Sequence, residues 1–282
     1  MTHDLESVYQ SHLDRVRAQM ARKQIDFLFL PIGPEFYYLT GCEGPSYHDR
    51  MRVWGDWIDG VFLGVEQGPV LIYHSAFSDP LFIEMKETFI MPEDDPDPDA
   101  TLARALGTFH TAGKAIATVK HAWAQTAFSL QQAAPQARFV TLNEPEWDEI
   151  TSVKDEYELS LMREAAGMTV ELMHEVASFI KVGMKVIDIK VEMLSQMAKR
   201  GVTPSFPPGI GCVNRDSDPD VRWNPQEIIQ PLGVIAFDFG VTYKGYQTDF
   251  GRSLFVKDAL PDRLQAWSVL TRIIQELTEM MG

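Results

Sequence analysis

The stretch that most constrains this chain is residues 233–256, GVIAFDFGVTYKGYQTDFGRSLFV. An apolar run ends at Asp238, turn residues follow at Lys244-Gly245, and a second strand-like run begins after Asp249. Apolar runs of this length, bounded by glycine-containing turns, are typical of paired strands. The pattern predicts two antiparallel strands joined by a tight connection.

Asp238 and Asp249 fall in or beside strands whose sequence reads as buried. A buried carboxylate is costly unless it is paired, hydrogen-bonded or bound to a cation. If the two acids oppose each other across the hairpin, they can hold one divalent ion or bridge two. Spacing alone leaves open a second interpretation, in which both acids are turn caps or salt-bridge partners.

The motif as a whole resembles the metal-binding hairpin of the pita-bread metallopeptidases, and more closely that of the creatinase, prolidase and aminopeptidase P branch. The residues that carry the resemblance are Asp238-Phe239-Gly240, Gly245-Tyr246, Asp249 and Arg252. The resemblance implies that Asp238 ligates one ion, that Asp249 bridges two ions, and that Arg252 orients a carboxylate from behind. It further implies two divalent ions (Mn, Co, Zn or Fe) and a metal-activated water that attacks a peptide carbonyl, commonly the one before proline.

Composition narrows the class of protein. A length of 282 residues allows one large domain or two ordinary ones. The formal charge of −15 argues against binding to nucleic acid or to an anionic membrane. The two cysteines, Cys42 and Cys212, form no disulfide framework or zinc motif, which fits a reducing compartment. With neither an apolar leader nor a membrane-length apolar run, the chain is expected to be soluble and cytoplasmic.

Hydrophobic periodicity predicts two domains. An alternation of helices and strands covers the first half of the chain, and two long helices followed by the acidic hairpin cover the second. The expected domains are a creatinase/prolidase-like N-terminal domain at 1–148 and a pita-bread catalytic domain at 149–282. The expected fold class is therefore α/β and α+β, with an N-terminal creatinase-like α/β domain followed by an incomplete pita-bread domain. The principal helices are predicted at 4–24, 79–87, 155–180, 186–200 and 260–281.

A stretch at 43–59 concentrates aromatic and basic side chains among loop-forming residues. Its candidates for contact with a substrate or a second subunit are His48, Arg52, Trp54 and Trp57. The alternative is an ordinary packed aromatic loop. In the family that the hairpin resembles, an N-terminal loop of one subunit can close the active site of the other, so the resemblance implies a homodimer.

Two departures from the family pattern keep other functions open. Residues 213–237 contain no histidine, although most peptidases of this family carry a substrate-binding histidine there, and Gly251 stands where a threonine is usual. These departures leave a small-molecule C–N hydrolase or lyase on the same fold as an alternative to a short-peptide hydrolase. A non-catalytic pita-bread module that binds peptides or a protein partner is the third interpretation.

The remaining ligands of such a site are one histidine and two glutamates, which the family takes from later strands. No residue after the predicted helix at 260–281 supplies them. Two carboxylates alone bind a divalent ion weakly, because catalytic sites normally use three or more protein ligands. The expectation is that this chain is the N-terminal part of a longer enzyme and is inactive by itself.

Overall fold

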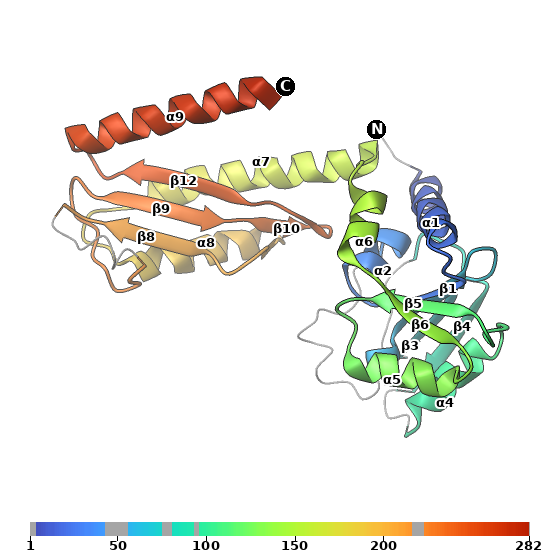
Figure 1. Ribbon diagram of the computed structural model, residues 1–282. Coiled ribbons are helices and arrows are strands. Elements are labelled where there is room, and N and C mark those ends of the chain that lie inside the picture. The colour runs from blue at the N-terminus through green and yellow to red at the C-terminus, as the bar shows by residue number, and fades with distance from the viewer. Residues whose placement is uncertain (1–3, 43–55, 75–80, 93–95, 216–222, 282) are drawn as a thin grey trace. The chain divides into compact units, whose positions relative to one another are not determined.

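The computed structural model describes residues 4–42, 56–74, 81–92, 96–215 and 223–281 (Figure 1). The chain divides into two compact units, Met1–Tyr157 and Glu158–Gly282. Helices of the described part of the chain are all too short or too polar to cross a membrane.

The first unit is built on a six-stranded sheet in the order β4-β3-β2-β1-β5-β6. Strand β2 is antiparallel to both of its neighbours, whereas β3 with β4, and β1 with β5 and β6, run parallel. The strands are β1 (Phe27–Pro31), β2 (Gly60–Gly64), β3 (Val70–His74), β4 (Glu87–Met91), β5 (Ala115–Val119) and β6 (Arg138–Leu142). The helices are α1 (Leu5–Arg22), α2 (Pro34–Thr40), the 3-10 helix η1 (Asp56–Ile58), α4 (Pro98–Leu106), α5 (Ala124–Ala133) and α6 (Glu144–Thr151).

Helices cover both faces of this sheet. Successive residues of β1 alternate between two cores: Leu28 and Leu30 pack with α1, α2 and α6, whereas Phe27 and Phe29 pack with α4 and α5. Strand β1 is therefore buried along its whole length, as expected for a parallel strand covered on both sides. The prediction of an α/β arrangement for this half of the chain is confirmed.

One predicted element of the first unit is wrong. A helix was expected at 79–87, but residues 81–86 form no helix and strand β4 begins at Glu87. Residues 87–91 pair in parallel with β3, from Val70↔Glu87 to His74↔Met91. Strand pairing thus overrides the weak helical spacing of this segment. Residues 79 and 80 lie outside the described part of the chain.

Helix α6 belongs with the first unit by its packing. The predicted domain boundary at 148/149 falls inside this helix, because α6 extends from Glu144 to Thr151. Ile150 is buried in the same core as Val16 of α1, and Trp147 packs against that core. The structural division at Tyr157/Glu158 therefore comes after α6 and near the start of α7 (Glu156–Phe179).

The second unit has two three-stranded sheets, in the orders β12-β9-β8 and β11-β10-β7. Helices α7 and α8 (Val186–Lys199) cover one face of the larger sheet, and their buried residues share a core with Ile210, Ile235 and Phe237. The strands are β7 (Thr203–Pro204), β8 (Gly209–Val213), β9 (Val234–Phe239), β10 (Val241–Tyr243), β11 (Tyr246–Gln247) and β12 (Phe250–Phe255). Both pairings of β9 are antiparallel, so the predicted antiparallel pair is confirmed.

Helix α9 (Pro261–Met281) has no buried residue along its length. Its first turn is fixed by Arg263, whose guanidinium donates hydrogen bonds to three main-chain carbonyls at 3.1 Å: Val213, Leu232 and Asn214. Farther along the helix, Trp267 contacts Phe255 edge-on. Arg263 therefore links α9 to the ends of β8 and β9.

Replacing Arg263 with alanine is expected to free α9 from the sheet. Hydrogen bonds from a charged donor each contribute about 1.5–3 kcal/mol, and three of them end on carbonyls here. We expect faster amide hydrogen exchange along α9 in Arg263→Ala. The matched control is Arg272→Ala on the same helix, where an exposed 3.8 Å pair with Glu276 should contribute little. Equal exchange in both variants would contradict the anchoring role.

Candidate metal centre

Strand register places Asp238 and Asp249 close together in the chain path of the β12-β9-β8 sheet. Asp238 of β9 pairs with Gly251 of β12, and Asp249 lies directly before β12, two positions before Gly251. On β9, Phe237 and Phe239 point into the core shared with α7 and α8. Successive side chains of a strand point to opposite faces, so Asp238 lies on the sheet face that those helices do not cover. Asp249 stands just before the start of the strand that pairs with Asp238.

Both carboxylates are exposed in this structure, so the prediction that they are buried is wrong. The alternation of β9 explains the error: its apolar residues form the buried face, and Asp238 lies between two of them on the opposite face. Among the described residues, neither acid has a hydrogen-bonding or ion-pairing partner for its side chain. The interpretation of the two acids as salt-bridge partners therefore has no support in the described part of the chain.

Glycines flank Asp238 on both neighbouring strands. Gly209 of β8 and Gly251 of β12 are its register partners. A Cβ at Gly209 would lie 3.4 Å from the Asp238 Cβ and 3.3 Å from Cζ3 of Trp223. The indole of Trp223, which is 53% exposed, therefore packs over Gly209 beside the carboxylate. This arrangement leaves space around Asp238 and gives that space one aromatic wall.

The connection between β9 and β12 is longer than the predicted tight turn. It contains a small hairpin, β10–β11, which turns at Lys244 (φ 44°) and Gly245 (φ 76°). Positive φ at both central positions is the signature of a type I′ hairpin turn. This hairpin is held to α7, because the hydroxyl of Tyr246 donates to Oε1 of the buried Glu158 at 3.0 Å.

Arg252, the residue predicted to orient a carboxylate, follows Gly251, the register partner of Asp238, on β12. Its register partner is Phe237, and its guanidinium lies 3.7 Å from the centroid of the Phe250 ring. It also donates to the carbonyl of Gly251 at 2.7 Å. Its described contacts include no bond to Asp238 or Asp249, so they give no support to the orienting role.

The predicted loop candidates are almost entirely outside the described residues. His48, Arg52 and Trp54 fall within 43–55, of which nothing is described. Trp57 lies in η1, where its carbonyl accepts a hydrogen bond from Thr126 at 2.5 Å. Their role in substrate or subunit contact stays a prediction.

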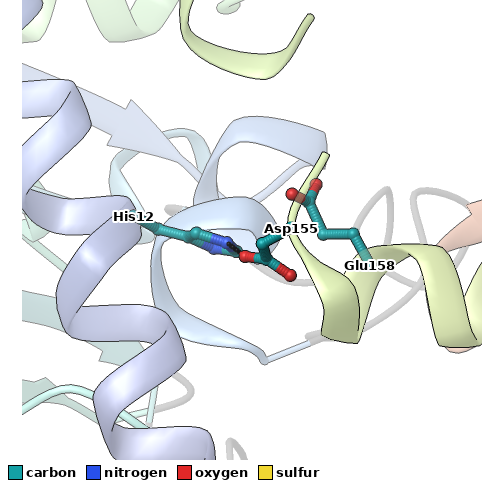
Figure 2. A group of neighbouring side chains, drawn as sticks. All are labelled: His12, Asp155 and Glu158. Carbon is teal, nitrogen blue, oxygen red and sulfur yellow. Dashed lines mark hydrogen bonds and ion pairs between the residues drawn. The ribbon is translucent and has the colours of Figure 1, made fainter. Parts of the chain in front are cut away.

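The first unit contains a histidine–carboxylate pair that sequence reasoning did not single out. His12 is buried, with Nδ1 2.7 Å from the carbonyl of Tyr38 and Nε2 2.7 Å from Oδ2 of Asp155 (Figure 2). The described contacts thus engage both ring nitrogens, one with a main-chain carbonyl and one with a carboxylate. They account for the polar atoms of this buried ring as a structural ion pair.

Sequence reasoning also missed the surroundings of Asp238. The sequence pattern predicts no strand at 209–213, where β8 lies, and gives no role to Gly209 or Trp223. The available signal was the position of Trp223, in the segment where the resemblance to the metallopeptidases implies a substrate-binding histidine.

Comparisons with known proteins give a family match for part of the chain and similar solved structures for its fold. Residues 160–282 match the model of metallopeptidase family M24. No curated protein sequence matches the chain.

Among solved structures, the Xaa-Pro dipeptidase from Bacillus anthracis has a TM-score of 0.73 at 16% identity, with 93% of this chain and 69% of that chain covered. The dipeptidase from Pyrococcus horikoshii OT3 has a TM-score of 0.72 at 16% identity, with 92% and 69% covered. The X-Pro aminopeptidase from Thermotoga maritima MSB8 has a TM-score of 0.70 at 17% identity, with 90% and 69% covered. The C-terminal part of this chain thus matches metallopeptidase family M24, and the chain has the fold of the pita-bread metallopeptidase superfamily, as its motifs predict.

Proposed function

We propose that this protein is a divalent-metal-dependent hydrolase of short peptides, with Asp238 and Asp249 as metal ligands. The observation that carries the proposal is that Asp249 lies two positions before Gly251, the register partner of Asp238, and that neither carboxylate has a counter-ion among the described residues. Neighbouring like charges repel each other, and a cation between them removes that repulsion. The match of residues 160–282 to metallopeptidase family M24 supports the same assignment.

Asp238 and Asp249 suit a hard or borderline divalent ion both in the type of ligand atom they offer and in their accessibility. Carboxylate oxygens are ligands that such ions prefer, and the glycines beside Asp238 leave the carboxylate accessible. When bound, the ions would supply a nucleophilic water and polarise the scissile carbonyl. Asp238 and Asp249 would hold the ions, and the Trp223 ring limits the room beside Asp238.

Two carboxylates do not complete such a site. Among the residues that the structure describes, neither Asp238 nor Asp249 belongs to a group of three or more ligating side chains. Catalytic metal sites commonly use three protein ligands. We therefore propose that the 282-residue chain binds a divalent ion weakly, and that full affinity requires ligands beyond these two.

A metal titration tests the assignment. Mn²⁺ binding to the chain, followed by electron paramagnetic resonance, should weaken by roughly tenfold or more in Asp238→Asn and in Asp249→Asn, because each variant removes one of two charged ligands. Glu171→Gln is the matched control, because this acid is exposed on α7, which covers the sheet face opposite to Asp238. Binding that is unchanged in both Asp variants would refute the site.

Trp223 favours a second candidate function, a small-molecule C–N hydrolase or lyase on the same fold. An exposed indole beside Asp238 suits stacking on a flat or cationic group of a small substrate. A panel of Xaa-Pro dipeptides separates the two candidates once a metal-loaded enzyme is in hand. Cleavage of the dipeptides supports the peptidase, whereas silence of the panel with metal bound favours the small-molecule enzyme. Absence of Asp238-dependent metal binding would leave the non-catalytic module as the remaining interpretation.

A further inference from the structure

The residue before Asp249 is held by hydrogen bonds through both its main chain and its side chain. The main-chain N–H of Thr248 donates to the carbonyl of Val241 at 2.9 Å, and the carbonyl of Thr248 accepts from the Ser205 hydroxyl at 2.8 Å. The Thr248 Oγ1 accepts from the N–H of Val241 at 2.9 Å. It also lies 2.8 Å from Oγ1 of Thr169, a buried residue of α7.

These contacts join α7 and the hairpin into one network of hydrogen bonds. The Thr169 hydroxyl donates to the carbonyl of Ala165 at 2.8 Å, one turn back on α7. Either hydroxyl can be the donor in the bond between Thr169 and Thr248, because the Thr248 hydroxyl also lies 3.5 Å from the carbonyl of Val241. In both arrangements the Thr248 hydroxyl connects β10 to α7.

If the contact between Thr169 and Thr248 served packing alone, an apolar residue at position 169 of α7 would be sufficient. Thr169 is fully buried in the interior of α7, next to the buried core residues Ala165 and Leu172. Valine has nearly the same shape as threonine and needs no hydrogen-bonding partner, so packing alone does not call for a hydroxyl here. What the hydroxyl adds is a directed bond from α7 to the residue that precedes Asp249.

We propose that the Thr169–Thr248 hydroxyl pair is a positioning device for Asp249. By tying Thr248 to α7, the pair fixes the position of Asp249, which lies directly before β12, relative to Asp238 on the neighbouring strand β9. Two carboxylates bind one cation well only when their oxygens are held at a set separation, and residues that support metal ligands from behind typically affect affinity by 10–100-fold. This inference rests on the proposed metal-binding function of Asp238 and Asp249.

The test uses Mn²⁺ alone as the probe on the 282-residue chain. Thr248→Val and Thr169→Val are expected to weaken the Asp238-dependent Mn²⁺ binding by about tenfold. Thr248→Ser and Thr169→Ser retain the hydroxyls and are expected to restore most of the affinity. Thr278→Val is the matched control, because Thr278 makes the same 2.8 Å bond to the carbonyl four residues back but lies on α9.

Thermal unfolding without metal separates positioning from simple stabilisation. If the valine variants lower the melting temperature while their Mn²⁺ affinity equals that of the wild type, the pair is structural only and the proposal is wrong. If Thr248→Val does not fold, Thr169→Val gives the same comparison with the hairpin sequence intact. If the wild type binds Mn²⁺ no better than Asp238→Asn, the proposed function itself fails and this inference falls with it. Metal binding that depends on Asp238 but not on either hydroxyl overturns the positioning role alone.

Discussion

Gly240→Ala is expected to unfold the segment from β9 to β12, which carries both Asp238 and Asp249. A Cβ at Gly240 would collide with the carbonyl oxygen of Thr248 and with the hydroxyl of Ser205, which donates a hydrogen bond to that carbonyl. The Ser205 hydroxyl can rotate away, but the Thr248 carbonyl is main chain, and shifting it disturbs the adjacent bond from the Thr248 N–H to the Val241 carbonyl. Overpacking of this kind costs about 1–3 kcal/mol or more. Because main-chain atoms are involved, we expect a loss of stability at the upper end of that range in urea unfolding.

The matched control is Gly167→Ala on α7. This glycine is exposed, and a Cβ there would meet nothing within 4 Å. Alanine is better than glycine in a helix interior by about 0.5–1 kcal/mol. The same substitution should therefore stabilise the chain at Gly167 and destabilise it at Gly240. Similar effects at the two positions would show that the close approach at Gly240 is wrongly described.

His12→Ala is expected to destabilise the first unit strongly. The His12 side chain is 1% exposed, and it stacks on the Tyr38 ring at a centroid distance of 4.1 Å. Its removal leaves the carboxylate of Asp155, only 22% exposed, without its 2.7 Å partner. Breaking a buried ion pair by removing one member typically costs about 3–5 kcal/mol. Chemical denaturation followed by circular dichroism measures the loss.

Arg22→Ala provides the comparison for His12→Ala. Arg22 lies on the same helix and pairs with Glu149 at 3.5 Å, but the two side chains are 62% and 49% exposed. Exposed pairs contribute about 0–1 kcal/mol. A loss in His12→Ala no larger than the loss in Arg22→Ala would mean that the His12–Asp155 contact is not the buried ion pair described here.

The sequence was most informative where one local signal decides the structure. Helices α1, α7, α8 and α9 follow from their apolar spacing, and the pairing of β9 with β12 follows from two apolar runs around turn residues. The resemblance to the pita-bread metallopeptidases also came from that hairpin. Local patterns of this kind depend on residues a few positions apart, which sequence displays directly.

The sequence was least informative where the local structure depends on residues far away in the chain. Strand β4 exists because residues 87–91 pair with β3, and β8 exists because Gly209 and its neighbours pair with β9. Neither pairing is visible in the segment itself. The exposure of Asp238 was also missed, since a run of apolar residues does not show which face of a strand is covered. The hydrogen bond between Thr169 and Thr248 joins positions far apart in the chain, so it could be found only in the folded structure.

The glycines that flank Asp238 have a consequence for the sheet backbone. Glycine is a poor strand former and shields no neighbouring peptide groups. In the row Gly209, Asp238 and Gly251, a single side chain therefore stands over three adjacent strands. Trp223 covers the Gly209 end of this row, whereas Gly251 is exposed and a Cβ there would meet nothing closer than 3.9 Å. The sheet thus has low intrinsic strand stability next to Asp238, and its backbone is accessible to water and small solutes on the β12 side of that carboxylate.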